Sequence, residues 1–175
     1  AGAAVTVLAM EYVGGRTARD VVTDHPIAYQ RALAWGVQIA RALEFAHDRG
    51  VVHCDLKPAN IQVDERPDGD HVKVLDFGIA RAMFEGPPTE AIAGTPAYMS
   101  PEQLTHGTCG SSADIYALGV TLFECLTGRR PYPARDPEEL ILQVIAGPVP
   151  RASTMLANVP RSVDAVLLRA MAKDP

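Results

Sequence analysis

The segment 115–126 constrains the fold of this chain most, because it is the longest apolar stretch and carries a single charged side chain, Glu124. A transmembrane helix needs about 20 mainly apolar residues, and this segment is shorter. We therefore expect a helix that is buried inside a globular domain.

The composition agrees with one globular domain, or a large piece of one. Of the 175 residues, 47% are hydrophobic and 21% are charged, which differs from the composition of disordered chains. The net charge of −5, from 16 basic and 21 acidic residues, excludes a basic nucleic-acid-binding surface spread over the whole chain. The first residues also lack the charged start of a secretory signal. We expect a cytoplasmic location, no nucleic-acid partner and no membrane contact by this segment. A membrane anchor elsewhere in a longer parent chain stays open.

The three cysteines, Cys54, Cys109 and Cys125, are too few and too scattered in the sequence to indicate a disulfide framework. They form no Cys-x-x-Cys pair, which argues against a zinc ribbon. This pattern favours a reducing compartment. We expect Cys54 to be an inert structural thiol, with a reactive thiol as the alternative.

Local patterns in the first part of the chain predict a strand at 5–10 and a short helix at 17–22. A long helix is expected at about 26–48, with Gly50 after its end. Apolar spacings of three and four residues predict the face that this helix buries: Leu33, Val37, Ala40, Leu43 and His47.

The rest of the chain predicts short elements separated by turns. Residues 61–63 and 72–75 read as two strands, joined into a hairpin by the polar turn at 65–70. Residues 79–101 are expected to form a long loop, of the kind that is usually functional or mobile. Helices are expected at about 101–105, 112–127, 137–146 and 161–172.

The loop at 53–60 is dense in ionisable side chains. Asp55, Lys57 and Asn60 provide a carboxylate, an ammonium group and an amide close together in the sequence. Residues i and i+2 of an extended loop point the same way, so Asp55 and Lys57 can converge on one reacting group. The alternative is a solvated loop, because exposure is the default for charged side chains.

Asp76, followed by Phe77 and Gly78, comes directly after the second strand of the predicted hairpin. A carboxylate at a strand end can bind a cation, and Mg²⁺ is usually held by one or two protein carboxylates together with substrate phosphates. The tripeptide alone is a common turn and weak evidence. The hairpin strengthens the interpretation, because it folds Asp76 back toward the loop at 53–60.

Motifs along the chain, taken in order, resemble those of one enzyme family. Residues 53–60 (His-Cys-Asp-Leu-Lys-Pro-Ala-Asn) and 76–78 (Asp-Phe-Gly) are similar to the catalytic and metal-binding loops of the eukaryotic-type protein kinases. Residues 94–102 resemble the end of their activation segment, 114–119 their central buried helix and 167–175 their penultimate helix. The amino-acid sequence of residues 94–103 resembles the corresponding segment of bacterial serine/threonine kinases in particular. The resemblance implies a mainly helical α+β large lobe, with residues 1–175 as a partial kinase domain.

The resemblance implies transfer of the γ-phosphoryl group of ATP to serine or threonine hydroxyls of a protein substrate. Asp55 resembles the catalytic base, and Lys57 the lysine that neutralises the transferred phosphoryl group. Asn60 and Asp76 match the two ligands of Mg²⁺, for which Mn²⁺ is an alternative. Both of these residues and Lys57 would thus contribute to nucleotide binding.

The resemblance also implies which residues surround the adenine and which support the site. Met10, Glu11 and Val13 resemble the gatekeeper and hinge that hold the adenine edge, and Gln62 occupies the floor beneath the ring. The supporting residues implied by the resemblance are the stacked spine residues His53 and Phe77, the loop-bracing carboxylate Asp114, and Glu102 at the end of the activation segment.

The sequence also departs from the family. Cys54 replaces an arginine that would receive an activation-segment phosphate, so we expect activity to depend weakly on Thr89 and more on Thr95, whose counterpart contacts the catalytic residues. Gln62 is polar where an apolar side chain is usual. The chain as given begins at the hinge strand and ends before the arginine that would pair with Glu102. We therefore expect an absent small lobe, an exposed or loosely held Glu102, and little activity of the isolated chain.

Two other functions compete with catalysis on proteins. A pseudokinase or interaction module would keep the fold without turnover, and Gln62 and Cys54 favour it slightly. The intact set of Asp55, Lys57, Asn60 and Asp76 opposes it. A phosphotransferase for small molecules is opposed by residues 96–102, which resemble a peptide-docking segment.

Overall fold

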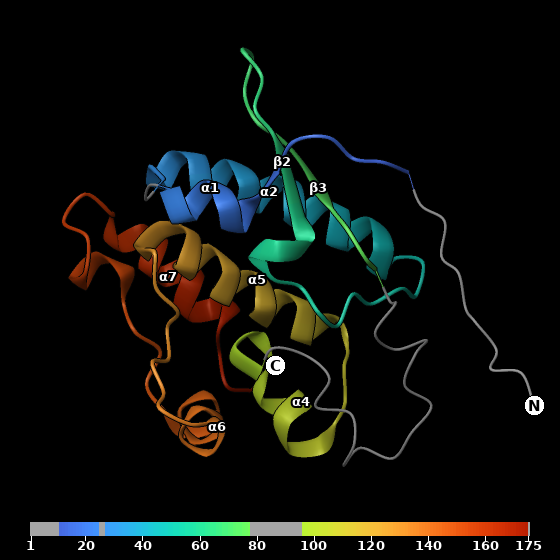
Figure 1. Ribbon diagram of the computed structural model, residues 1–175. Coiled ribbons are helices and arrows are strands. Elements are labelled where there is room, and N and C mark those ends of the chain that lie inside the picture. The colour runs from blue at the N-terminus through green and yellow to red at the C-terminus, as the bar shows by residue number, and fades with distance from the viewer. Residues whose placement is uncertain (1–10, 25–26, 78–95, 175) are drawn as a thin grey trace, which may run out of the picture.

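Helix α5 (Ser111–Thr127) runs through the centre of the computed structural model, which describes residues 11–24, 27–77 and 96–174 (Figure 1). Nearly the whole helix is buried, although Ile115 in its first turns is 41% exposed. Gly128 ends the helix in a left-handed conformation (φ 69°), and its N–H donates to the Glu124 carbonyl at 2.8 Å. The buried helix predicted from the apolar segment 115–126 is confirmed.

Other helices pack against α5 or against one another, and their bounds lie close to those predicted. The α-helices are α1 (Ala18–Asp24), α2 (Tyr29–His47), α4 (Pro101–His106), α6 (Pro137–Ala146) and α7 (Arg161–Ala170), and the 3₁₀ turns are η1 (Pro58–Asn60), η2 (Pro96–Tyr98) and η3 (Ala152–Thr154). The mainly helical fold with a small sheet is therefore confirmed. Within the described residues, no helix has both the length and the apolar character that a membrane span requires.

Local sequence explains where two of these helices begin. Ser100 and Gln103 form a capping box at the start of α4, and Pro101 occupies the first turn, where its missing N–H costs nothing. The Asp136 side chain caps α6 by accepting a hydrogen bond from the Glu139 N–H at 2.8 Å.

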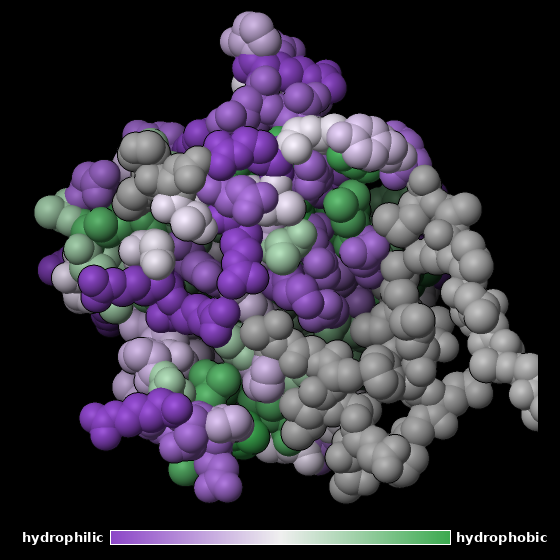
Figure 2. Space-filling view, viewed as in Figure 1, coloured by the Kyte–Doolittle hydropathy of each residue, from purple (hydrophilic) through white to green (hydrophobic). Residues whose placement is uncertain are grey.

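A three-stranded antiparallel sheet covers one side of the helices, in the order β1 (Arg16–Thr17), β2 (Ile61–Asp64) and β3 (His71–Val74). The β2–β3 hairpin agrees with the prediction, and its projecting tip carries hydrophilic side chains (Figure 2). The pairing of β1 with β2 was not predicted. It requires Gly15 (φ 105°), because a Cβ atom there would lie 2.4 Å from the Val63 carbonyl oxygen. The strand predicted at 5–10 lies outside the described residues.

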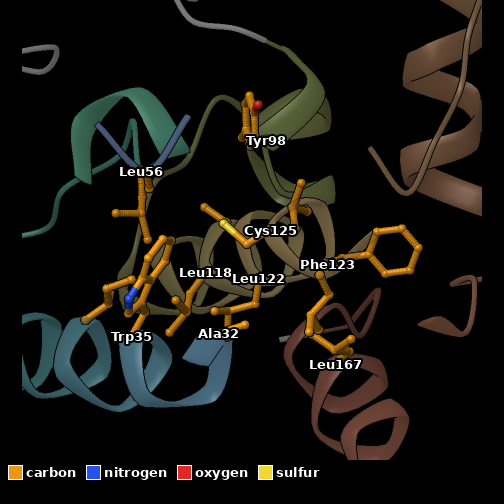
Figure 3. Packing of buried hydrophobic residues seen from close by; sticks show 14 of the residues in the cluster. Ala32, Trp35, Leu56, Tyr98, Leu118, Leu122, Phe123, Cys125 and Leu167 are labelled. Atoms are coloured by element: carbon orange, nitrogen blue, oxygen red, sulfur yellow. The ribbon is translucent and has the colours of Figure 1, made fainter. Parts of the chain in front are cut away.

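The core forms where α2 and α7 pack against α5. Trp35 of α2 and Leu167 of α7 lie against apolar side chains of α5 such as Leu122 (Figure 3). Close contact is possible at Gly36, where a Cβ atom would lie 2.9 Å from a methyl group of Leu122.

The predicted core face of α2 was confirmed at Leu43 and wrong at two of its positions. Val37 is 51% exposed and Ala40 is also exposed, whereas the buried residues are Ala32, Trp35, Gly36, Ile39 and Leu43. Both sets have spacings of three and four residues, so periodicity alone did not separate them. The large Trp35 side chain and the small Gly36, which allows α5 to approach, favour the observed face.

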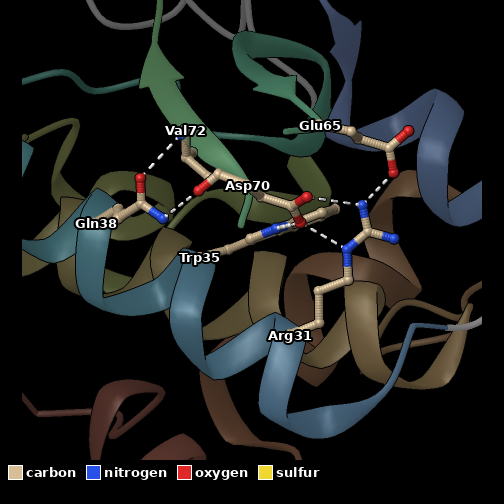
Figure 4. A network of polar contacts seen from close by, with 6 residues as sticks. All are labelled: Arg31, Trp35, Gln38, Glu65, Asp70 and Val72. Atoms are coloured by element: carbon tan, nitrogen blue, oxygen red, sulfur yellow. Dashed lines mark hydrogen bonds and ion pairs between the residues drawn. The ribbon is translucent and has the colours of Figure 1, made fainter. Parts of the chain in front are cut away.

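A polar network fixes the hairpin to α2 (Figure 4). The Asp70 carboxylate accepts hydrogen bonds from the Arg31 guanidinium at 2.6 Å and from the Trp35 indole N–H at 2.5 Å, and Arg31 also pairs with Glu65. The Gln38 amide donates to the Asp70 carbonyl and accepts from the Val72 N–H, both at 2.9 Å. Gln38 thus occupies hydrogen-bonding groups on the strand edge that β2 does not use.

Candidate active site

Asp55, Lys57 and Asn60 converge in the loop between α2 and β2. The Lys57 ammonium group donates to Oδ2 of Asp55 at 2.6 Å, and the Asn60 amide donates to the same oxygen at 3.2 Å and to the Asp55 carbonyl at 2.8 Å. The Asp55 side chain remains 27% exposed. Within the described parts of the chain, its Oδ1 has no hydrogen-bond partner. A carboxylate that is held on one oxygen and open on the other can accept a proton from a hydroxyl group.

The Asp114 carboxylate anchors this loop from α5. It is 1% exposed and accepts hydrogen bonds from the backbone N–H groups of His53 and Cys54, both at 2.8 Å. Its third donor is Nε2–H of His47 at 2.7 Å, at the end of α2. A buried carboxylate requires such donors, and here they connect α5 to both α2 and the loop at 53–60.

The His53 ring is fully buried, and hydrogen bonds engage both of its nitrogens. Nε2–H donates to the Leu75 carbonyl at 2.8 Å, and Nδ1 accepts from the Asp55 N–H at 3.2 Å. This arrangement fits a neutral imidazole with a fixed tautomer. The Phe77 ring lies 4.8 Å away, centroid to centroid. His53 therefore supports the loop and is not placed to carry protons.

Asn60 comes directly before β2 and Asp76 comes just after β3, so both lie at the open end of the hairpin. The Leu75 N–H donates to the Asn60 carbonyl at 2.8 Å, one position beyond the Ile61–Val74 pair, and Asp76 follows. Asp76 is exposed and left-handed (φ 62°), a conformation that is uncommon for a residue with a Cβ atom and is enriched at functional sites. One carboxylate and one amide fit Mg²⁺, which takes few protein ligands when phosphates supply the rest. The described residues contain no group of three acidic, His or Cys side chains that could hold a metal.

Cys54 and Cys109 form a disulfide, with their Cα atoms 5.9 Å apart. The expectation that Cys54 is an inert free thiol was therefore wrong. No local pattern indicated this bond, because the two residues are 55 positions apart and meet only where the loop at 53–60 lies against the connection between α4 and α5. Cys125 is the free cysteine among the described residues; it is buried in α5, which raises the pKa of its thiol to about 12.

A polar cavity of about 350 Å³ lies between residues 11–14 and the hairpin. Glu11, Val13 and Gln62, three of the four residues expected around adenine, line it. Ile61 and Val63 lie on the buried face of β2, and Gln62 and Asp64 lie on its other face, as strand alternation predicts. Lys73 of β3 pairs with the Glu11 carboxylate at 3.0 Å. The fourth expected residue, Met10, lies outside the described residues.

A larger cavity of about 720 Å³ lies between η2 and the connection from α5 to α6. Pro96 and Ala97 line it on one side, and Glu124, Arg130 and Tyr132 on the other. The Tyr98 hydroxyl donates to the Glu124 carboxylate at 2.6 Å and so links η2 to α5. Burial, together with the adjacent Glu124 charge, raises the pKa of Tyr98, which remains a neutral donor.

The other sequence-predicted residues have mixed outcomes. Glu102 is half-buried in a well-formed α4 and accepts a hydrogen bond from the Ser112 hydroxyl at 3.1 Å, so its segment is not loose. Thr89 and Thr95 lie outside the described residues. Sequence reasoning placed His47 on the buried face of its helix but missed its contact with Asp114. It missed Gln103 altogether, whose side-chain amide donates to the Cys54 carbonyl at 3.3 Å. Gln103 belongs to the capping box of α4, but nothing local indicated its second contact.

Comparison with known sequences agrees with this geometry. The profile of the protein kinase domain matches residues 3–175, and the chain therefore belongs to the protein kinase family. It is 43% identical over 174 residues to the serine/threonine-protein kinase PknB of Mycolicibacterium smegmatis, and 39% identical over 171 residues to the serine/threonine-protein kinase PrkC of Bacillus subtilis. These alignments cover 96% of this chain but only 27% and 26% of the relatives, so the chain spans about a quarter of the length of these curated relatives. The resemblance to bacterial serine/threonine kinases is confirmed.

Proposed function

We propose that the protein containing this chain is an ATP-dependent protein serine/threonine kinase, and that residues 1–175 belong to its catalytic domain. The observation that carries the proposal is the cluster of Asp55, Lys57 and Asn60, with one oxygen of Asp55 left open. Family membership supports the same activity. We propose a cytoplasmic location, where ATP is available, and no nucleic-acid partner, in keeping with the net charge of −5.

The chain's own side chains account for the chemistry of phosphoryl transfer. Asp55 would orient the acceptor hydroxyl and take its proton on Oδ1, while Lys57 and Asn60 hold Oδ2 and fix the carboxylate plane. Lys57 would also lie beside the transferred phosphoryl group and neutralise its charge. Phosphoryl transfer depends mainly on such positioning and charge neutralisation, since it needs no covalent intermediate with the protein.

Asn60 and Asp76 are the residues that would hold Mg²⁺, or Mn²⁺ in its place. Bound with ATP, the ion supplies neutralisation of the phosphate oxygens. The adenine would lie in the cavity lined by Glu11, Val13 and Gln62, whose volume of about 350 Å³ suits part of a nucleotide. The polar Gln62 replaces an apolar contact with the ring, so we expect modest affinity for adenine.

A protein acceptor is favoured by the larger cavity beside η2. Pro96 and Ala97 immediately follow Thr95, and the cavity of about 720 Å³ next to them is large enough for several side chains of a bound peptide. The Tyr98–Glu124 hydrogen bond keeps η2 against α5 and gives the cavity a fixed wall.

The proposal is tested by Asp55→Asn in the full-length protein. We expect phosphate transfer to fall by at least ~10²-fold with little change in ATP affinity, because the base is lost while the nucleotide contacts remain. Asp48→Asn, at the exposed end of α2, is the matched control and should keep the wild-type rate. A near-normal rate for Asp55→Asn would mean that Asp55 is not the base. Absence of transfer by the wild type with ATP still bound would favour the interaction-module function.

A further inference from the structure

We propose that Cys54 and Cys109 form a reversible redox modification site, reduced by a dithiol, whose disulfide form holds the catalytic loop in its working geometry. The proposal concerns regulation of the active site and rests on the kinase function proposed above. Its covalent part can nevertheless be tested without any activity.

The disulfide joins two segments that meet at the active site. Cys54 immediately precedes Asp55, and Cys109 lies in the connection between α4 and α5. Every other residue of that connection, 107, 108 and 110, is exposed, whereas Cys109 is half-buried against the loop. The disulfide is therefore the contact that fixes this connection to Cys54.

Cys54 is held at three points. Its N–H donates to Asp114, its carbonyl accepts from the Gln103 amide, and its sulfur is bonded to Cys109. Its backbone is left-handed (φ 65°), a conformation that persists in a residue with a Cβ atom only when the surroundings enforce it. Reduction removes one of the three restraints, and because Asp55 is the next residue, relaxation at Cys54 displaces the catalytic carboxylate directly.

The position of the bond suits a reversible reaction. Both cysteines are half-buried, so the bond lies nearer the surface than Cys125, which is 1% exposed and whose thiol pKa is raised by burial. In a reducing compartment, disulfides are usually transient and redox-sensing and not permanent structural bonds. The proposed cytoplasmic location thus favours a switch.

The reaction is thiol–disulfide exchange. A thiolate of the dithiol attacks one sulfur of the Cys54–Cys109 bond, which breaks, and the other cysteine leaves as a thiolate and takes up a proton. The second thiol of the reductant then attacks the mixed disulfide. The protein ends with two thiols and the reductant with its own disulfide, after transfer of two electrons and two protons.

The test uses the full-length protein after equilibration in buffers of reduced and oxidised dithiothreitol. Native alkylation followed by mass spectrometry counts free thiols, hydrogen exchange follows the amides of residues 53–60, and phosphate transfer from ATP gives the rate. On reduction, wild type should gain alkylation at Cys54 and Cys109 together, and its loop amides should exchange faster. The rate should fall roughly tenfold, less than the ~10² that a displaced catalytic group can cost, because Asp114 still anchors the loop. Re-oxidation should restore all three.

Two variants separate this site from general thiol effects. Cys109→Ser should have the low rate and fast exchange in both buffers, with Cys109→Ala as a second variant if serine disturbs folding. Cys125→Ala should respond to the buffers as wild type does. Alkylation of Cys54 and Cys109 without reductant, or equal loop exchange in both buffers, would overturn the proposal. If no form transfers phosphate, the kinase function fails, while alkylation and exchange still decide whether the redox site exists.

Discussion

At the scale of single residues, Asp114 links more of the site than any other side chain described here. Three N–H donors, from His47, His53 and Cys54, converge on its two oxygens. An ionised carboxylate offers only acceptors, so it can satisfy all three. Asparagine has nearly the same shape but must turn a donor N–H₂ group toward at least one of these N–H groups.

Asp114→Asn is therefore expected to destabilise the domain by about 3 kcal/mol, since it leaves buried donors opposed or unpaired. Urea unfolding of wild type and variant measures the difference, and exposed Asp48→Asn is the control for the change of charge. Equal stability of the two variants would show that the Asp114 carboxylate is not needed to anchor the loop.

Lys173 provides a pH-dependent prediction. Its ammonium group donates to the Val144 carbonyl at 2.5 Å and the Tyr132 hydroxyl at 2.7 Å, and burial lowers its pKa to about 8 from an unfolded value of 10.5. Between these values the unfolded chain binds more protons than the folded chain, so stability should rise with pH across this window. The gain should be on the order of 1 kcal/mol, because the group is partly solvated and screened.

The measurement for Lys173 compares unfolding free energies near both ends of the window, for wild type and Lys173→Met. Burial raises the pKa of the adjacent Tyr132, so that residue stays neutral through most of this range. The wild type should gain stability relative to the variant as the pH rises. Parallel curves for the two proteins would contradict the assignment.

At the scale of elements, Gln38 is one of the α2 residues that fix the hairpin, and it alone among them contacts the backbone of the hairpin on both a donor and an acceptor. Gln38→Ala would leave the Val72 N–H and the Asp70 carbonyl without their partner, which should cost about 1–2 kcal/mol. The Val72 amide should also exchange faster with solvent. Gln30→Ala, on the exposed side of the same helix, is the matched control. Unchanged exchange at Val72 would mean that β2 and Asp70 alone hold the hairpin.

Elements were predictable from the sequence where their signals are local. Helix starts at Pro101 and Pro137 carry caps, and the hairpin carries a polar turn, so their bounds were predicted closely. The core face of α2 was missed because it depends on how closely Gly36 lets α5 approach. The two-residue strand β1 was missed because its pairing with β2 joins segments far apart in the sequence.

In the candidate site too, contacts within one short segment were predictable from the sequence, and contacts between distant segments were not. Asp55, Lys57 and Asn60 lie within one short loop, so their spacing alone indicated a cluster, and the structure brings them within hydrogen-bonding distance. The contacts of His47 and Gln103 could not be read in the same way. Their partners lie 67 and 49 positions away, and only the packing of α2 and α4 around the loop brings them together.

At the scale of the whole molecule, the disulfide joins two parts of the chain that α5 otherwise holds together. Cys54 follows α2, Cys109 precedes α5, and the segment between them includes β2, β3 and α4, with a sequence separation of 55. Closing a loop of this length removes entropy from the unfolded chain, which corresponds to about 4 kcal/mol in the chain-entropy account.

We therefore expect reduction of the disulfide, or Cys109→Ser, to lower the unfolding free energy by up to about 4 kcal/mol, less any structure that the unfolded chain retains. Because Cys109→Ser has no disulfide to reduce, reduction should not destabilise it further, whereas Cys125→Ala should lose stability on reduction as wild type does. Denaturant unfolding of all three proteins, with and without reductant, makes the comparison. The loss should also add to that of Gln38→Ala, since Gln38 contacts neither cysteine. A reduced wild type as stable as the oxidised one would show that the bond does not restrain the unfolded chain.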